Sequence, residues 1–270
     1  EIIWQRTTAG KPVFRNLPKN SDTIFWFSKS DEYRFEPILQ PLTEEDKATF
    51  KSDDDDGKGR YNTQPIINPG DRPNLKYIYT DLKGREWHPP KNGWRFNEER
   101  MHRLENENRL VFGNTSIREK YYLSECEVKG KQLSNIWTDI SIVTGSERLG
   151  YPTQKPIALL ERIIKASSNE GDIVLDPFCG CGTAVHAAQK LNRQWVGIDI
   201  THLSISLIEK RLRDAFTDIA FEVHGTPKDL DGARNLALRD KYQFQWWACS
   251  LVNAQPYQGK KKGADSGIDG

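Results

Sequence analysis

Long apolar runs are absent from this chain of 270 residues. No stretch approaches the roughly 20 apolar residues that a membrane-spanning helix needs, and the mean hydropathy is -0.72, so we expect a water-soluble protein with no membrane partner. Cysteine is scarce, with four in the chain, and the first residues do not resemble a secretory signal. These features exclude a disulfide scaffold and favour reduced thiols in a cytoplasmic protein.

Net charge is also nearly absent. Lys and Arg number 39 against 38 Asp and Glu, giving +1, so the total charge indicates no partner. A nucleic-acid-binding chain with this balance must gather its basic residues on one face. The hydrophobic fraction of 36%, with 10% aromatic residues, is typical of a folded globular chain and excludes a disordered one. The length allows one large domain or two small ones.

The first 30 residues contain two apolar, aromatic segments, at 1–5 and 23–28, that predict β-strands. The first residue, Glu1, is not an initiator, and a strand is predicted immediately after it. We therefore expect the chain to be a piece of a longer protein.

Residues 31–90 are rich in Pro, Gly, Asp and Lys and predict an irregular surface excursion. Four consecutive Asp residues at 53–56 could suggest a calcium loop, but Lys58 would then take the fifth position and Pro65 the twelfth. We expect a solvated acidic turn instead.

Aromatic residues alternate with cations between residues 91 and 140, around a predicted helix at 97–107 and a predicted strand at 109–112. Such a pattern can supply phosphate contacts and stacking surfaces for a nucleic acid. The alternative is an ordinary half-buried face on which Arg stems cover Trp.

Regular alternation of helices and strands begins near residue 150 and predicts an α/β fold with a doubly wound parallel sheet. The predicted elements are a helix beginning at Pro156, a strand at 173–176, a helix at 184–191, a strand at 195–199, a helix at 201–216 and a strand at 220–223.

The loop after the predicted strand 173–176 is the best candidate for a ligand site, because ligands of parallel α/β sheets bind beyond the carboxyl ends of the strands. Gly180 and Gly182 would allow a ligand close to the backbone, and Asp199, which ends the next strand, could accept hydrogen bonds from ribose hydroxyls. A dinucleotide fingerprint would need a small residue where Val185 stands, and no P-loop lysine is present. S-adenosylmethionine, a nucleoside without phosphate, suits this loop best; NAD remains the weaker alternative.

Cysteine and histidine near this loop do not predict a metal site. Cys179 and Cys181 flank one glycine, but no second pair of ligands follows at zinc spacing. We expect these thiols to be structural, and His186 and His202 to be helix residues rather than catalysts.

Three segments together resemble the amino-methylating DNA methyltransferases of restriction-modification systems, in their permuted β group. They are Tyr-Pro-Thr-Gln-Lys-Pro at 151–156, Asp-Pro-Phe-Cys-Gly-Cys-Gly-Thr at 176–183 and Gly-Ile-Asp at 197–199. Segments at 1–6, 21–29, 93–95 and 135–140 are similar to that group too, so the resemblance covers about residues 1–235. It implies a Rossmann-like, circularly permuted methyltransferase sheet that is incomplete here and carries an irregular recognition insertion.

The resemblance also divides the chain. Residues 1–30 would be strands of the methyltransferase core, 31–150 the target recognition region, 151–235 the half that binds S-adenosylmethionine, and 236–270 a linker with the start of a nuclease-like domain.

The same resemblance assigns the cofactor contacts. Phe178, Gly180 and Gly182 would line the methionine and adenine side, Asp199 would hold the ribose, and Asp176 would lie near the cationic groups of the cofactor. The full expected set is Thr153, Gln154, Lys155, Pro156, Asp176, Phe178, Gly180, Gly182, Thr183 and Asp199, of which residues 153–156 would close over the methionine.

The implied reaction moves a methyl group to the exocyclic amine of adenine, in preference to that of cytosine, in double-stranded DNA. The family holds that amine with an Asp/Asn/Ser-Pro-Pro-aromatic segment. The only Pro-Pro here is in His88-Pro89-Pro90-Lys91, which lacks the acceptor and the aromatic residue. The catalytic segment precedes the recognition region in the β group, so we expect it to lie outside this chain, to leave a gap beside the strand 173–176, and to leave the chain without catalytic residues.

Other functions stay open at this point. The chain could be a non-catalytic DNA-binding or specificity module, or a methyltransferase acting on RNA or on a protein side chain, and the sequence allows a dimer as well as a monomer. The last segment, 263–270, resembles the Gly-Asp-Gly-Asp turn of Mrr-type nucleases, in which Asp269 would be the first metal ligand. The alternative for this segment is a flexible acidic tail.

Overall fold

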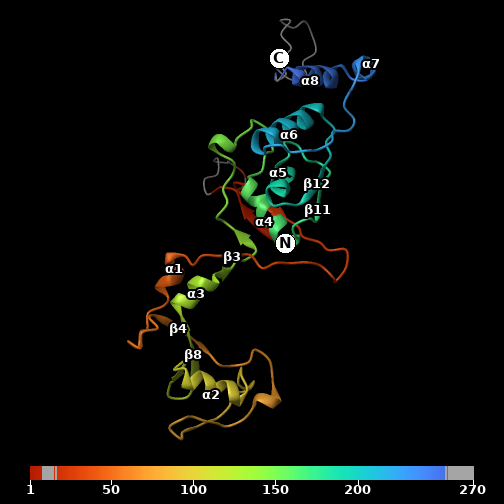
Figure 1. Cartoon of the computed structure of the whole chain (residues 1–270). Coiled ribbons are helices and arrows are strands. Elements are labelled where there is room, and N and C mark those ends of the chain that lie inside the picture. Colours follow the sequence, from red (N-terminus) through yellow and green to blue (C-terminus); the bar gives the residue numbers. More distant parts are fainter. Residues whose placement is uncertain (8–14, 16, 253, 255–270) are drawn as a thin grey trace. The chain divides into compact units, whose positions relative to one another are not determined.

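The structure is a computed structural model that describes residues 1–7, 15, 17–252 and 254 (Figure 1). It divides into two compact units: unit 1 comprises Glu1–Ile38 and Ser134–Gly270, and unit 2 comprises Leu39–Leu133. The tail segment 263–270, with Asp269, lies outside the described residues. Among the described helices, none is both long and apolar enough to cross a membrane.

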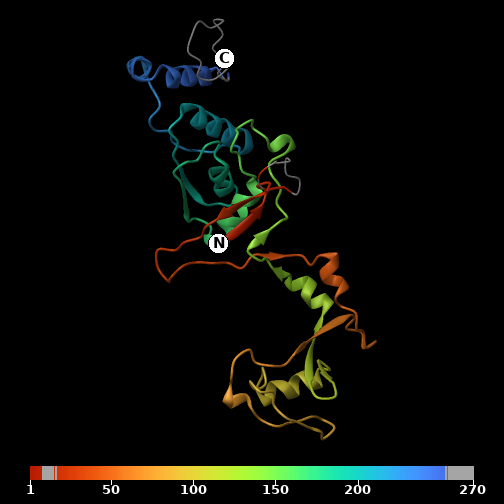
Figure 2. The same ribbon diagram turned by 180° about the vertical axis from the view of Figure 1, so that it is seen from behind.

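Unit 2 has a hydrophobic core of its own, although residues 31–90 predicted only an irregular excursion. The core contains Ile66, Tyr79, Trp94, Met101, Leu104, Leu110 and Ile117. Helix α2 supplies Met101 and Leu104, β7 supplies Leu110 and β8 supplies Ile117. Figure 2 shows this unit from behind, in orange and yellow. The elements of this unit are β3 (Leu39–Gln40), α1 (Glu44–Ala48), β4 (Tyr61–Pro65), η1 (Pro73–Leu75), β5 (Tyr79–Thr80), β6 (Glu86–Trp87), α2 (Glu98–Asn106), β7 (Leu110–Phe112), β8 (Ile117–Tyr122), α3 (Leu123–Lys129) and β9 (Lys131–Gln132). The predicted helix and strand at 97–107 and 109–112 are therefore confirmed as α2 and β7.

The acidic run at 53–56 serves an ion pair inside unit 2. The ammonium group of Lys120, on β8 and 3% exposed, lies against the carboxylate of Asp54, which also accepts a hydrogen bond of 2.6 Å from the Tyr61 hydroxyl. Neither here nor elsewhere in the described residues do three or more acidic, His or Cys side chains gather as metal ligands. Asp54 is thus a counter-ion for a buried cation.

Unit 1 begins with a three-stranded sheet built from both of the sequence segments that make up this unit. Strand β1 (Ile2–Gln5) pairs in parallel with β10 (Ile136–Trp137) and antiparallel with β2 (Ser21–Ile24). Trp4 is fully buried and donates a hydrogen bond of 2.7 Å to the carbonyl of Ile140. The predicted strand 1–5 is confirmed, whereas the second strand ends at Ile24, earlier than the predicted residue 28.

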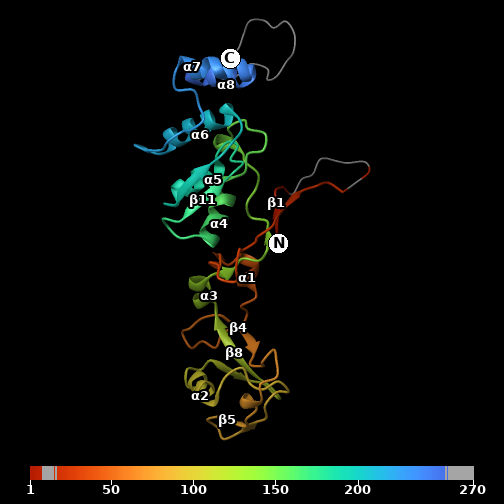
Figure 3. The ribbon, with the colours of Figure 1, turned by 90° about the vertical axis from the view of Figure 1, so that its right-hand side faces the viewer.

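The second half of unit 1 shows the predicted α/β alternation. After η2 (Gly145–Glu147), the elements are α4 (Ile157–Ser167), β11 (Ile173–Asp176), α5 (Thr183–Lys190), β12 (Gln194–Gly197) and α6 (His202–Ala215). Strands β11 and β12 are parallel and in register from Ile173 and Gln194 to Asp176 and Gly197. Val174 and Trp195 point to α4 and α5, which lie beside β11 in Figure 3, and pack there on Ile164, Ala187 and Ala188.

The opposite face of the β11–β12 sheet is uncovered. Ile173 and Leu175 are 66% and 59% exposed, and Val196 on β12 and Ile198 just after it are 48% and 53% exposed. No strand of the described residues pairs with the second edge of β11, the edge beside which the sequence predicts a gap. An apolar strand with one open face and one open edge is unusual for a parallel sheet, which is normally covered on both faces.

The predicted strand at 220–223 is wrong. Ile219 and Phe221 do pack on the cluster around Ile208 and Leu212, as an alternating strand would, but the backbone makes no ladder with β12. The alternation correctly indicated which side chains pack inward, but it does not determine whether the backbone pairs with a neighbouring strand. The chain then forms α7 (Leu230–Arg239) and α8 (Lys241–Leu251), and Gln243 of α8 accepts a hydrogen bond of 3.0 Å from the N–H of His202.

The ion pair of unit 2 can be tested by replacing Asp54 with Asn. Hydrogen bonds from Lys120 and Tyr61 hold the pKa of the Asp54 carboxyl below its usual value, so its stabilisation is present above the unfolded-state pKa and is lost as pH falls through the folded-state pKa. We expect Asp54→Asn to lower the free energy of unfolding by about 1–2 kcal/mol at neutral pH, because a buried ammonium loses its counter-ion, and the difference from wild type to vanish in acid.

Urea denaturation at several pH values measures this difference. Asp55→Asn is the matched control, since Asp55 is exposed and has φ +55°, a conformation that Asn tolerates. Equal stability of the Asp54 and Asp55 variants at neutral pH would contradict the assignment.

Candidate functional site

The loop between β11 and α5 contains most of the residues that the sequence selects. Asp176 ends β11, and its carboxylate accepts a hydrogen bond of 3.2 Å from the N–H of Phe178, whose ring is almost fully exposed. The N–H of Cys179 donates to the carbonyl of Ile198, at 2.9 Å, and the N–H of Gly182 donates to that of Cys179, at 2.7 Å. The loop is thus attached to the end of β12 before α5 begins at Thr183.

The two glycines of this loop are required by protein neighbours. Gly180 has φ +49°, and a Cβ there would lie 3.1 Å from the ring of Tyr151. Gly182 has φ +70°, and a Cβ there would lie 2.6 Å from the side chain of Ile208, on α6. The sequence explained both glycines by close approach of a ligand; the structure shows the positive φ and the side chains of Tyr151 and Ile208 as the constraint.

The carboxylate of Asp199 joins the loop to the start of α6. One of its oxygens accepts a hydrogen bond of 2.9 Å from the N–H of Gly180. The other accepts a bond of 3.0 Å from the N–H of Thr201 and lies 3.1 Å from the Thr201 hydroxyl. A carboxylate has about four lone-pair positions, so Asp199 keeps capacity for further donors.

A chain of hydroxyl groups closes this arrangement into a ring. The Thr201 hydroxyl lies 2.7 Å from that of Ser204, and the Ser204 hydroxyl lies 3.4 Å from that of Tyr151. The ring of Tyr151 in turn lies over Gly180. The segment before α4, the glycine loop, the end of β12 and the start of α6 are therefore held together around Asp199.

The segment 151–156 meets the glycine loop through Tyr151, and Gln154 and Lys155 have partners elsewhere in unit 1. Gln154 donates to the carbonyl of Glu147 at 2.7 Å and accepts from the N–H of Leu149 at 2.8 Å. Lys155 lies 3.8 Å from the carboxylate of Asp22, and Pro156 precedes α4. Thr153 is exposed.

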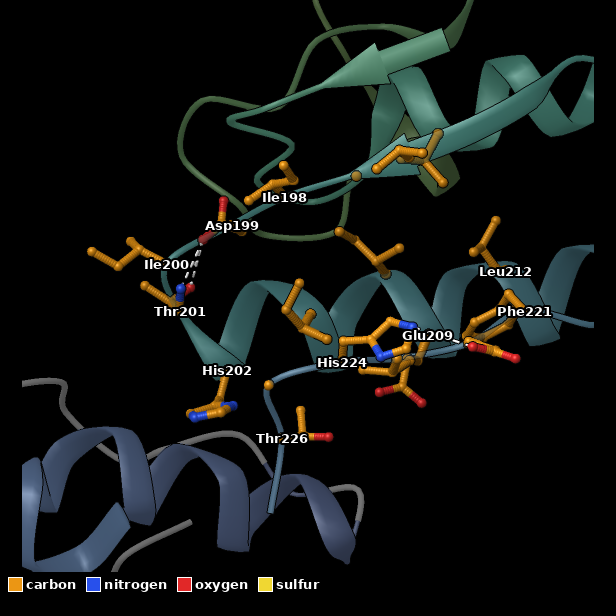
Figure 4. A pocket seen from close by; sticks show the side chains of 18 of the residues that line it. Ile198, Asp199, Ile200, Thr201, His202, Glu209, Leu212, Phe221, His224 and Thr226 are labelled. Atoms are coloured by element: carbon orange, nitrogen blue, oxygen red, sulfur yellow. Dashed lines mark hydrogen bonds and ion pairs between the residues drawn. The ribbon is translucent and has the colours of Figure 1, made fainter. Parts of the chain in front are cut away.

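A cavity of about 560 Å³ opens between β12, α6 and residues 221–226 (Figure 4). Asp199, Ile200 and Thr201 lie at one end of it, and Leu212 and Phe221 at the other. Its interior is apolar and its rim carries acids and imidazoles, an arrangement suited to a flat aromatic ligand with polar edges. Of the predicted cofactor residues, Asp199 lines this cavity, and the glycine loop and residues 153–156 do not.

Burial explains the thiols and imidazoles of this region. Burial, with the charges of Asp199 and Asp176, raises the pKa of the Cys179 thiol to about 11. Burial lowers the pKa of His186 to about 4, and its ring lies against Phe216, 5.0 Å between centroids. At neutral pH the raised pKa of Cys179 disfavours the thiolate, and the lowered pKa of His186 keeps its imidazole neutral.

Sequence reasoning missed several residues that shape the site, namely Tyr151, Ser204, Ile208 and Arg211. The last three are spaced as i, i+4 and i+7 on α6, which places them on one face of the helix. This spacing was visible in the sequence, but nothing in it indicated that the face contacts the glycine loop. Pro90 is the first residue of a turn that is closed by a hydrogen bond from the N–H of Gly93 to the carbonyl of Pro90.

Comparison with known proteins finds a match to a family model described as DNA methylase, over residues 1–210. The Type II methyltransferase M.EcaI of Enterobacter cloacae is 30% identical over 219 residues, which is 78% of this chain and 46% of that protein. The Type II methyltransferase M.HpaI of Haemophilus parainfluenzae is 46% identical over 146 residues, 52% of this chain and 46% of the relative. The chain thus spans about half the length of these curated relatives.

Solved structures also match parts of the chain. The crystal structure of an M1.HpyAVI–SAM complex aligns with 40% of this chain and 54% of its own, at 31% identity and a TM-score of 0.28.

The contact between Gly182 and Ile208 gives a test of the loop. Gly182→Ala combines a positive φ with a clash, so we expect the free energy of unfolding to fall by about 2–4 kcal/mol. Gly171 has φ +83° and no atom within 4 Å of an added Cβ, so Gly171→Ala should lose only about 1–2 kcal/mol from strain.

Chemical denaturation of both variants measures the difference. Ile208→Ala should lower the free energy of unfolding less in the Gly182→Ala variant than in wild type, because it removes the side chain with which the added Cβ clashes. Equal losses for the two glycine variants would show that α6 does not constrain the loop.

Proposed function

The chain belongs to the DNA methylase family, and from this premise we propose that it is the part of a DNA methyltransferase that binds S-adenosylmethionine and the target duplex. The proposed reaction transfers the methyl group to the exocyclic amine of adenine, in preference to that of cytosine. The Type II methyltransferases among its relatives support methyl transfer as the reaction, and the preference for adenine is our proposal.

The observation that carries the cofactor proposal is the position of Asp199. This carboxylate lies at the carboxyl end of β12, is tied to the N–H of Gly180, and borders the cavity. Carboxyl ends of neighbouring parallel strands are where nucleosides bind in such sheets. Asp199 would accept hydrogen bonds from the ribose hydroxyls, and the adenine would occupy the apolar cavity beside Ile200 and Phe221.

The remaining predicted residues would act on the methionine part of the cofactor. Asp176 and the exposed Phe178 stand at the end of β11, where a carboxylate would favour the cationic sulfonium or ammonium groups. Gly180, Gly182 and Thr183 would contribute backbone, and residues 153–156 would approach from the segment held by Tyr151. S-adenosylmethionine itself supplies the methyl group and the leaving thioether.

The acceptor amine requires groups that this sequence does not contain. An exocyclic amine is a weak nucleophile because its lone pair is delocalised into the base, and it needs positioned acceptors and a stacking ring. The open edge of β11 and its uncovered face, with Ile173 and Leu175, support our proposal that a further polypeptide segment with an Asp/Asn-Pro-Pro-aromatic sequence completes the sheet there. We propose that the chain by itself does not methylate.

Unit 2 is proposed to contact DNA. The guanidinium groups of Arg95 and Arg100 lie 5.8 and 4.2 Å from the ring centroid of Phe96, and neither makes an ion pair within the described residues. Cations that are held on aromatic rings and free of carboxylates are suited to phosphate contacts and stacking. The same two cations favour a second candidate function, that of a non-catalytic DNA-binding module.

The cofactor site is tested by calorimetric titration with S-adenosylmethionine. We expect Asp199→Ala to weaken binding about 10-fold or more, because hydrogen bonds to a charged group contribute about 1.5–3 kcal/mol. Asp214→Ala, which removes an exposed carboxylate from α6, should bind like wild type. Unchanged affinity of the Asp199 variant would refute the ribose contact.

The proposal that this chain needs a further catalytic segment is tested by labelled methyl transfer. We expect the chain alone to transfer no methyl group from S-adenosylmethionine to duplex DNA or to RNA, and the chain combined with the Pro-Pro segment of a related methylase to methylate DNA. Digestion to nucleosides then distinguishes N6-methyladenine from N4-methylcytosine. Transfer by the chain alone would contradict the proposal, and transfer to RNA in preference to DNA would change the substrate class.

A further inference from the structure

Arg211, on α6, is a buried cation without a carboxylate partner. Its side chain is 8% exposed, and it forms no ion pair within the part of the chain that the structure describes. One guanidinium nitrogen donates to the carbonyl of Cys181 at 2.9 Å and to the hydroxyl of Thr183 at 3.2 Å, and lies 3.9 Å from the Cys181 sulfur. All three atoms belong to the glycine loop and the first residue of α5.

This location is unfavourable for a positive charge. Burying an ion has a desolvation cost that the neutral acceptors, and the charge of Glu147 acting from beyond ion-pair distance, offset only in part. Thr183 is also the first residue of α5, and the N-terminus of a helix carries a partial positive charge that disfavours a cation. An apolar side chain of similar length would fill the same space without these costs, so stability alone does not account for Arg211.

The contacts of Arg211 with the glycine loop indicate a functional reason for an arginine at this position. Ser204, Ile208 and Arg211 form the face of α6 that meets the site, and they contact Tyr151, Gly182 and the segment Cys181–Thr183 respectively. Ser204 contacts Tyr151 through a single pair of hydroxyl groups, and Ile208 contacts Gly182 through an apolar side chain. Arg211 alone uses charge-assisted hydrogen bonds to fix a backbone carbonyl of the loop.

We infer that Arg211 is a positioning residue for cofactor binding, which sets the path of the glycine loop without touching the cofactor. This inference rests on the proposed binding of S-adenosylmethionine. Because the guanidinium group would act through Cys181 and Thr183, it should affect S-adenosylmethionine and its uncharged-sulfur product, S-adenosylhomocysteine, to the same extent.

The test compares Arg211→Met and Arg211→Lys with Lys210→Met, which removes an exposed cation from the neighbouring position. We expect Arg211→Met to weaken binding of both ligands at least tenfold and by equal factors in calorimetry, Arg211→Lys to recover part of the affinity, and Lys210→Met to match wild type. Affinity of Arg211→Met within twofold of wild type would overturn the inference. Loss of S-adenosylmethionine binding with S-adenosylhomocysteine unaffected would also overturn it, since that result indicates direct electrostatic contact.

A second measurement does not depend on the cofactor. Cys181 and Cys249 are both buried, and only Cys181 is bonded to Arg211. We expect iodoacetamide, followed by mass spectrometry, to label Cys181 faster in the Arg211 variants and Cys249 at an unchanged rate. Equal protection of Cys181 in wild type and variants would refute the positioning role, even if wild type binds no S-adenosylmethionine. Faster labelling of both thiols would indicate general unfolding and would likewise refute it.

Discussion

The hydrogen bonds to the carboxylate of Asp199 are the interaction on which the site depends. One carboxylate accepts N–H groups from Gly180 and from Thr201, which are separated by β12 and α5 in the sequence. Each is a charge-assisted bond, of the kind that is shorter and stronger than a neutral one. Because Thr201 also starts α6 through its bond with Ser204, the same acid fixes the loop and the first turn of the next helix. A ligand that bonds to Asp199 therefore meets a group whose orientation is set before binding.

The sequence predicted those parts of unit 1 that local patterns determine. The apolar run that ends at Asp176 predicted β11 at its observed bounds. The glycines that follow, and the small residues after them, predicted the loop and α5 to within one residue. The strand at 220–223 failed because alternation specifies which side chains are buried, but a strand also needs a neighbour for its backbone. The contact of Arg211 with Cys181 joins residues thirty positions apart, and such pairs follow only from the tertiary fold.

Unit 2 was less predictable for a different reason. Met101 and Leu104 have the helical spacing of α2, but other core residues, such as Ile66, Tyr79 and Trp94, come from short strands and loops and follow no period. Gly93 illustrates the constraint: it has φ +85°, and a Cβ there would lie 2.8 Å from the carbonyl of Arg72. The irregular segments are held by such close backbone contacts. A composition rich in Pro and Gly indicated loops correctly, but gave no sign that these loops enclose a core.

The open edge of β11 has a consequence for the behaviour of the chain in solution. A row of unpaired N–H and C=O groups beside exposed Ile173 and Leu175 is a template for intermolecular β-sheet formation. Natural sheets protect such edges with charged residues, prolines or bulges, and the run Ile-Val-Leu has none of these. A strand supplied by another polypeptide would pair with these groups and would also cover the exposed Ile173 and Leu175.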